Sequence, residues 1–140
     1  MTEISKATLL TLSDARLSEA EALLAAGLWS GAYYLAGYAV ELRLKARIAD
    51  QFKAGVIPDQ AEVKTVYTHD LLKLVSRANL GKAHAEALKS DKEFAAHWSV
   101  VDDWDEQSRY AIWDETAATA LLEAITAPGN GVMAWLAQHS

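Results

Sequence analysis

Apolar residues recur along the chain at intervals of three and four, and no stretch of five or more residues alternates like a half-buried strand. This pattern predicts an all-α fold. The first helix is expected to begin near Ser5 or Ser13 and to end at Ala26. Gly27 then stops it, because glycine readily adopts the left-handed backbone found there. A second helix, capped by Ser30, should follow after three residues and return antiparallel to the first.

The middle of the chain contains the one long loop that the pattern predicts. The second helix is expected to run to Gly55, and residues 55–67 should form this loop, because Pro58 prevents simple continuation of a helix. A third helix should start with Thr68 as its cap and end at Gly81. The residues expected on its buried side are Leu71, Leu72 and Val75.

The last third of the chain carries clear helix boundaries. Ser90 and Glu93 form a capping-box pattern at the start of a fourth helix. Its expected buried residues are Phe94, Trp98, Val101 and Trp104. Residues 105–115 interrupt the periodicity, and a fifth helix should run from about Asp114 to Ala127, before the turn sequence PGNG. We therefore expect an up-and-down antiparallel bundle of four to five helices plus a short C-terminal helix.

Composition limits the organisation and the class of protein. A chain of 140 residues with 51% apolar and 23% charged residues is typical of one globular domain, here residues 1–140. The absence of cysteine excludes disulfides and thiolate metal sites, and the start MTEISKATLL lacks the order of a signal peptide. We therefore expect a cytoplasmic protein. No apolar run approaches the roughly 20 residues of a membrane span, so no membrane association is expected.

The net charge of −6 argues against a protein that binds nucleic acid over its whole surface, because such binding depends on Lys and Arg. It leaves room for a local basic patch. The histidines lack the spacing and acidic partners of a zinc site, so neither a metal nor a cofactor is expected.

The second helix changes character along its length, since residues 31–40 carry no charge and residues 41–47 carry four. Small residues gather in the uncharged half, which would let a neighbouring backbone approach closely. They are Gly31, Ala32, Ala36, Gly37 and Ala39. A half that is apolar nearly all round predicts either a central helix or one partly covered by a second copy of the protein, and we expect a homodimer.

The charged half offers two interpretations. Tyr38, Glu41 and Lys45 lie along one face, and Glu41 precedes Lys45 by one turn. The pair could be a solvated salt bridge worth only about 0.3–0.5 kcal/mol. Alternatively, it could lie at the edge of a groove, where Arg43 and Arg47 would meet a phosphate or the carboxylates of a partner.

The stretch AGLWSGAYYLAGYAVELRLKARI, followed by THDLLKL and by SRY, resembles the HEPN domains of prokaryotes. The resemblance extends from about Leu17 to Leu136. Its most specific positions are Glu41, Leu44, Lys45, His69, Asp70, Leu72, Arg109 and Tyr110. It implies a dimeric bundle of four or five helices linked to nucleotide or RNA chemistry. Such proteins are often encoded beside minimal nucleotidyltransferases in toxin–antitoxin pairs, which implies a partner of that type.

Many HEPN proteins are metal-independent ribonucleases with Arg, four to six residues and then His at the head of the last helix. The histidine moves the proton of a ribose hydroxyl, and the arginine holds the phosphate. Arg109 stands where this arginine is expected, but no histidine follows before His139. Asp114 or Glu115 has the right spacing, although a surface carboxylate is a poor proton donor near neutral pH.

Other histidines offer weaker candidates. Arg77 and His84 are separated by six residues, but Gly81 is expected to end a helix between them. His97 reads as a half-buried histidine with a local partner. His69 stands beside Asp70 at a helix start, where both could have only local roles.

Three functional hypotheses follow. In the first, the protein is a non-catalytic HEPN-like module that binds a nucleotide, RNA or a partner protein. The groove in question would be lined by Glu41, Lys45, His69, Asp70, Arg109 and Tyr110. In the second, it is a ribonuclease toxin that uses Arg109 with His69 or His97. In the third, it is a purely structural bundle in which Arg109 and Glu41 are buried ion partners.

Overall fold

The computed structural model describes residues 4–52 and 54–139, and in this part of the chain it contains helices and no strand. The predicted all-α class is therefore confirmed. The α-helices are α1 (Lys6–Ala25), α2 (Trp29–Ala49), α3 (Gln60–Val66), α4 (Leu71–Arg77), α5 (Gly81–Ser90), α6 (Lys92–Asp102), α7 (Glu115–Thr126) and α8 (Val132–Gln138), and a 3₁₀ helix, η1, spans Glu106–Tyr110. None of these helices is both long and apolar enough to cross a bilayer.

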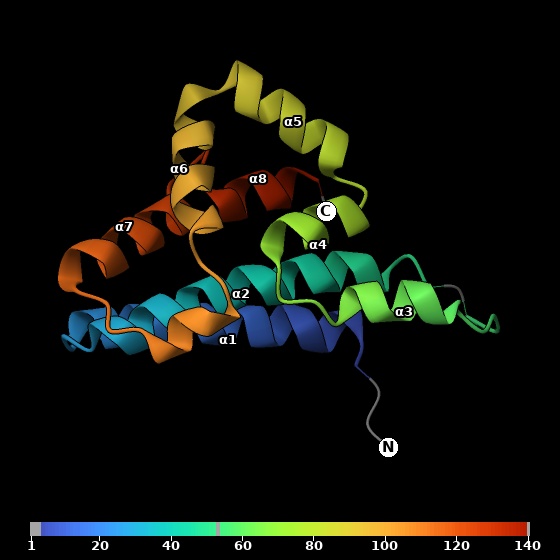
Figure 1. Cartoon of the computed structure of the whole chain (residues 1–140), viewed down its shortest axis with the longest axis horizontal. Helices are drawn as coiled ribbons and strands as arrows, with labels where there is room; N and C mark the ends of the chain where they lie inside the picture. The colour runs from blue at the N-terminus through green and yellow to red at the C-terminus, as the bar shows by residue number, and fades with distance from the viewer. Residues whose placement is uncertain (1–3, 53, 140) are drawn as a thin grey trace.

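Helices α1 and α2 form the predicted antiparallel hairpin and lie side by side along the long axis of the molecule (Figure 1). Ser5 caps α1 by accepting a hydrogen bond from the Thr8 amide. Gly27 has a φ of 77° and ends the helix as predicted. Ser30 is not the cap of α2, which already begins at Trp29. Ser30 lies in the first turn of α2, and its hydroxyl accepts a hydrogen bond from the Trp113 amide at 2.9 Å.

Helix α2 is the central element, because it contacts α1, α4, η1, α7 and α8. Its small residues are covered by these neighbours within one chain, so the burial of its uncharged half does not require a second copy. The fully buried residues of this half include Ala32, Ala36, Ala39 and Val40. Ser13 of α1 donates a hydrogen bond to the Ala39 carbonyl at 2.7 Å and fixes the two helices against each other.

Gly37 allows the closest approach in the core. A Cβ atom at this position would overlap three atoms of the Trp104 indole, so the ring lies directly on the helix backbone. The Trp104 Nε1 donates a hydrogen bond to the Tyr34 carbonyl at 3.1 Å. This contact holds the segment that leads into η1 against α2.

The segment after α2 differs from the prediction. Helix α2 ends at Ala49 rather than Gly55, and residues 60–66 form α3 instead of part of a long loop. The Asp59 carboxylate caps α3 by accepting a hydrogen bond from the Ala61 amide at 3.1 Å. This short helix buries none of its residues fully, so it leaves no periodic apolar pattern in the sequence.

The region between α4 and α5 also differs. Asp70, not Thr68, caps α4 by accepting a hydrogen bond from the Lys73 amide, while Thr68 accepts one from the Asp70 amide. Asn79 supplies the left-handed residue after α4, with a φ of 61°, and Gly81 starts α5 instead of ending a helix. Leu71 and Val75 are buried as predicted. The prediction that Leu72 is buried is wrong, because this residue is 49% exposed.

The start of α6 is shifted by one residue. The Asp91 carboxylate accepts hydrogen bonds from the amides of Glu93 and Phe94, whereas the Ser90 hydroxyl donates to the Glu86 carbonyl at the end of α5. The predicted buried residues of this region are confirmed, namely Phe94, Trp98, Val101 and Trp104. Asp114 caps α7, and α8 is the predicted C-terminal helix.

Candidate functional site

Glu41 lies at the centre of a cluster of charged side chains on α2. It is only 1% exposed. Its Oε2 lies 3.1 Å from the Lys45 Nζ, and both of its carboxylate oxygens lie 3.0 Å from the His69 Nδ1. The interpretation of Glu41 and Lys45 as a solvated surface pair is therefore wrong. Burying a carboxylate is costly unless it is paired, and the two neighbouring groups compensate Glu41.

His69 extends the cluster toward η1. Its Nε2 lies 3.5 Å from the Glu106 Oε2, and the other oxygen of Glu106 lies 3.5 Å from the Arg109 Nη2. The Arg109 guanidinium in turn lies over the Tyr110 ring, 4.9 Å from its centroid. Five of the six predicted site residues are thus connected, with Glu106 as an additional member. We call this set of side chains the Glu41 cluster: Glu41, Lys45, His69, Glu106, Arg109 and Tyr110.

The sixth predicted residue, Asp70, lies outside the Glu41 cluster and stabilises the start of α4. Its carboxylate caps α4 by accepting a hydrogen bond from the Lys73 amide, and the residue follows His69 directly in the sequence. Asp70 and His69 also line an acidic hollow together with Asp102, Asp105 and Glu106.

The 3₁₀ helix η1 is fixed by its own hydrogen bonds. The buried Ser108 accepts a hydrogen bond from the Asp105 amide at 3.1 Å, and the Ser108 carbonyl accepts one from the Trp113 Nε1 at 2.9 Å. Glu106 and Arg109 flank Ser108 in sequence and are each partly exposed. Their backbone is therefore held in place, while their side chains remain accessible to a ligand.

A cavity of about 650 Å³ lies between α1, α2 and α3 beside the cluster. Tyr38, Glu41, Lys45 and His69 line it, and most of the remaining wall is apolar. The apolar residues include Leu9, Leu12, Leu42, Phe52, Val63 and Val66. An apolar cavity of this size with a few polar groups on one wall is typical of a small-molecule site. The contribution of α3 to this wall was missed by the sequence analysis.

Tyr38 joins the cavity to the charged groups. Burial, followed by the nearby Glu41 carboxylate, raises the pKa of the Tyr38 hydroxyl. A tyrosine hydroxyl is protonated at neutral pH in any case, and the raised pKa widens that margin, so the Tyr38 hydroxyl can donate a hydrogen bond to a ligand. At the outer end of the cluster, the Tyr110 hydroxyl is the main group that raises the pKa of the Arg109 guanidinium.

Several predicted arrangements are wrong. Arg109 and Glu41 are not ion partners, because Glu106 and His69 lie between them. Arg43 and Arg47 do not line the cavity beside Glu41. They lie with Lys6 and Asp50 in a separate small cleft, and the Arg47 Nε donates to the Ala78 carbonyl.

The remaining histidine candidates lie apart from the cluster. His84 is buried against the rings of Phe94 and Trp98, whereas Arg77 donates hydrogen bonds to Thr65 and Gln51, so the two do not form a pair. The His97 Nδ1 lies 3.0 Å from the Asn130 carbonyl. Asp114 is occupied in capping α7. In residues 4–52 and 54–139 no three potential ligands come together as a metal site would require.

Glu106 is the member of the cluster that the sequence analysis did not select. Its position three residues before Arg109, on the same side of η1, is the only local signal that could have found it. Its contact with His69 joins residues 37 positions apart and follows from the tertiary fold alone.

Comparisons of the chain with protein-family models, with curated proteins and with solved structures find no match. The HEPN resemblance therefore stays a prediction made from the sequence.

Proposed function

We propose that this protein is a non-catalytic, HEPN-like module of the cytoplasm that binds a nucleotide, free or within RNA, in the cavity between α1, α2 and α3. The observation that carries the proposal is the buried Glu41, which fixes Lys45 and His69 on one wall of a largely apolar cavity. A buried charge is costly to maintain, and ionisable groups held in this way are concentrated at functional sites.

The cavity suits the base and the phosphate of a nucleotide. Its apolar wall, including Phe52 and the ring of Tyr38, offers contact to the faces of a base. Lys45 uses one of its three donors on Glu41, and the others would bind the edge of the base or a phosphate oxygen. Arg109 lies at the outer end of the Glu41 cluster, where a following phosphate of an RNA would lie.

The surroundings of His69 favour binding over catalysis. Each of its ring nitrogens faces a carboxylate, Glu41 on one side and Glu106 on the other. A histidine that moves the proton of a ribose hydroxyl needs one nitrogen directed at the substrate. Glu106 also lies between His69 and Arg109, where its negative charge opposes a phosphate in contact with both.

Calorimetric titration with the four ribonucleoside monophosphates tests the proposal. We expect at least one nucleotide to bind saturably, and Lys45→Met to weaken its binding about tenfold, because a charged hydrogen bond is lost. Tyr38→Phe, which removes only a hydroxyl, should weaken binding about threefold to tenfold and keeps the test independent of Glu41. Lys82→Met on the exposed part of α5 is the control and should have no effect. If no nucleotide binds, or if Lys82→Met has the same effect, the proposal fails.

The second candidate is the metal-independent ribonuclease toxin. One observation favours it: the fold brings His69 and Arg109, which are far apart in sequence, to the two oxygens of one side chain, Glu106, although the charge of Glu106 opposes a phosphate between them. Incubation of the protein with total RNA and a metal chelator distinguishes the two functions. The binding module leaves the RNA intact, whereas cleavage abolished by both Arg109→Ala and His69→Ala would establish the enzyme.

We propose in addition that the protein forms a homodimer through the surface beside η1. Tyr110 is 72% exposed and Ile112 is 96% exposed, next to Arg109. Two apolar side chains this exposed at the edge of a charged cluster fit a protein interface. A nucleotidyltransferase-type partner would take the place of the second copy on this surface, and a gene for such a protein beside this one would favour a toxin–antitoxin pair.

A further inference from the structure

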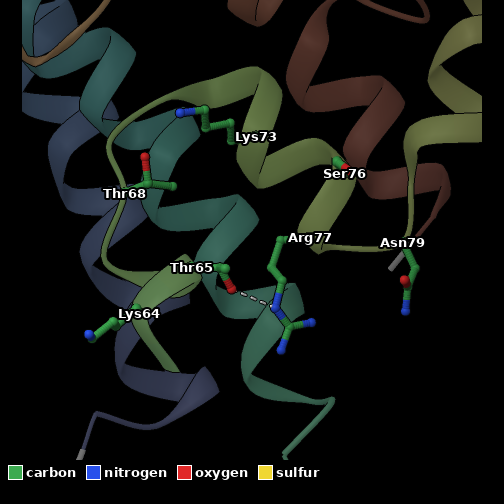
Figure 2. Close-up of a pocket in the computed structure, with 7 residues that line it drawn as sticks. All are labelled: Lys64, Thr65, Thr68, Lys73, Ser76, Arg77 and Asn79. Atoms are coloured by element: carbon green, nitrogen blue, oxygen red, sulfur yellow. Dashed lines mark hydrogen bonds between the residues drawn. The ribbon is translucent and has the colours of Figure 1, made fainter. Parts of the chain in front are cut away.

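A separate pocket lies between α3 and α4 (Figure 2). It shares no lining residue with the cavity between α1, α2 and α3, which we call the Glu41 cavity. The α3–α4 pocket has a volume of about 520 Å³. Three cationic side chains line it, those of Lys64, Lys73 and Arg77. The other lining residues are Thr65, Thr68, Ser76 and Asn79, each of which carries a hydrogen-bond donor.

The positive charge of this pocket is not neutralised. No carboxylate lines it, and within residues 4–52 and 54–139 no ion pair joins Lys64, Lys73 or Arg77 to an acidic side chain. The whole chain has a net charge of −6 and contains 19 acidic residues against 13 basic ones. Three unpaired cations around one hollow are therefore contrary to the charge of the rest of the molecule.

Arg77 is positioned without being neutralised. Its Nε donates a hydrogen bond to the Thr65 hydroxyl at 2.9 Å, and its Nη1 donates to the side-chain carbonyl of Gln51. The guanidinium also lies 5.8 Å from the centroid of the Phe52 ring. All of these partners are uncharged, so they orient the guanidinium and leave its charge available to an anion.

The cations are spread along the pocket instead of converging on one point. In Figure 2 the ammonium groups of Lys64 and Lys73 lie on the side of Thr68, and Arg77 lies between them and Asn79. A single phosphate would contact only part of this arrangement. A chain of phosphate groups would place successive negative charges next to successive cations.

From this arrangement we propose that the α3–α4 pocket binds a chain of phosphate groups, independently of any base. Such a chain is present in an inorganic polyphosphate and in the backbone of a single-stranded nucleic acid. Arg77 would bind one phosphate through the donors that Thr65 and Gln51 leave free, and Lys64 and Lys73 would bind its neighbours. The proposal does not depend on the function proposed for the Glu41 cavity.

Two probes test the site, inorganic tripolyphosphate by calorimetry and a labelled single-stranded oligouridylate by fluorescence anisotropy. The variants are Lys73→Gln, Arg77→Gln and the double variant. Lys82→Gln on α5 is the control, because it changes the net charge as much as Lys73→Gln does and lies outside the pocket. Arg77 also supports the local fold through Thr65 and Gln51, so the exposed Lys73 supplies the variant that carries no such risk.

We expect each single variant to weaken binding about threefold to tenfold and the double variant about tenfold or more. For the oligonucleotide, the logarithm of the binding constant falls with the logarithm of the salt concentration. This negative slope should become shallower by about 0.7 for each phosphate contact that is lost. Binding with this pattern supports the site. Binding of tripolyphosphate alone assigns an inorganic polyphosphate, binding of the oligonucleotide alone assigns a nucleic-acid backbone, and binding of both assigns the phosphate chain that they share. Lack of binding by both probes, or equal weakening by Lys82→Gln, overturns it. Tyr38→Phe should leave tripolyphosphate binding unchanged, which separates this result from the test of the cavity.

Discussion

Glu41 is the residue on which the charged cluster depends, since its buried carboxylate joins α2 to the segment that precedes α4. Glu41→Gln leaves Lys45 and His69 without their common negative charge. We expect the free energy of unfolding to fall by about 3 kcal/mol, because one partner of a buried ionic group is removed. Urea unfolding followed by circular dichroism measures this change.

The ion pair between Lys6 and Asp50 is a matched control, because both of its side chains are well exposed. Asp50→Asn should cost less than about 1 kcal/mol. Equal losses for Glu41→Gln and Asp50→Asn would contradict the central role of Glu41 in the fold.

Gly37 shows how a residue without a side chain determines packing. In Gly37→Ala the new methyl group would overlap the Trp104 indole, so either the ring or the helix must move. We expect a loss of about 3 kcal/mol in the same unfolding measurement. Gly31→Ala on the same helix meets only the flexible end of Leu23 at 3.2 Å, and should change stability by no more than about 1 kcal/mol. Similar effects of the two substitutions would argue against the close contact.

His84 should make stability depend on pH. It is buried against three aromatic rings, those of Phe94, Trp98 and Trp135. This burial lowers the pKa of His84 below its ordinary value of 6.5, and Asp102 offsets part of the effect. The unfolded chain therefore takes up the proton more readily, so stability is lost as the pH falls below about 6.5. Between about pH 7 and pH 5, His84→Leu should lose less stability than the wild type, and parallel pH profiles would exclude this role.

Among the elements, the start of α6 provides a direct test of helix capping. Asp91→Ala removes the carboxylate that accepts from two amides and should cost about 1 kcal/mol in urea unfolding. Ser90→Ala removes a hydroxyl that bonds only within α5, and should change stability by a few tenths of a kcal/mol at most. A larger loss for Ser90→Ala than for Asp91→Ala would instead support the capping box of Ser90 and Glu93 that was expected from the sequence.

The sequence allowed the longest and most apolar elements to be predicted. The α1–α2 hairpin, the buried face of α6 and the limits of α7 follow from periodicity and from caps such as Ser5 and Asp114. Helices α3 and α5 were not predicted. Neither buries a full apolar face, and α4 already ends at Arg77, so Gly81 begins α5 instead of ending the helix before it.

The candidate site shows the same division. Glu41 and Lys45 share a helix face, and this local relation was visible in the sequence. The contacts of His69 with Glu41 and Glu106 join three separate segments of the chain. The i, i+3 spacing of Glu106 and Arg109 is the one local relation that could have indicated Glu106, and not Glu41, as the partner of Arg109.

At the scale of the whole molecule, α2 is covered from within one chain, so a homodimer must depend on a different surface. We expect sedimentation velocity to give twice the mass of one chain, and Ile112→Asp to produce the monomer, because a charge at this exposed position opposes an apolar contact. Ile57→Asp is the control, since Ile57 is equally exposed and lies in the segment before α3. A monomeric wild-type protein would refute the dimer. Dissociation by Ile57→Asp but not by Ile112→Asp would place the interface at the segment before α3 instead of beside η1.

The indole of Trp104 lies in the space that any larger residue at position 37 would fill, and Glu106 follows two residues later. The position of Glu106 relative to His69 consequently depends in part on a steric fit between two uncharged residues, Gly37 and Trp104. Substitutions there would retune the electrostatics of the cluster without altering a single ionisable group.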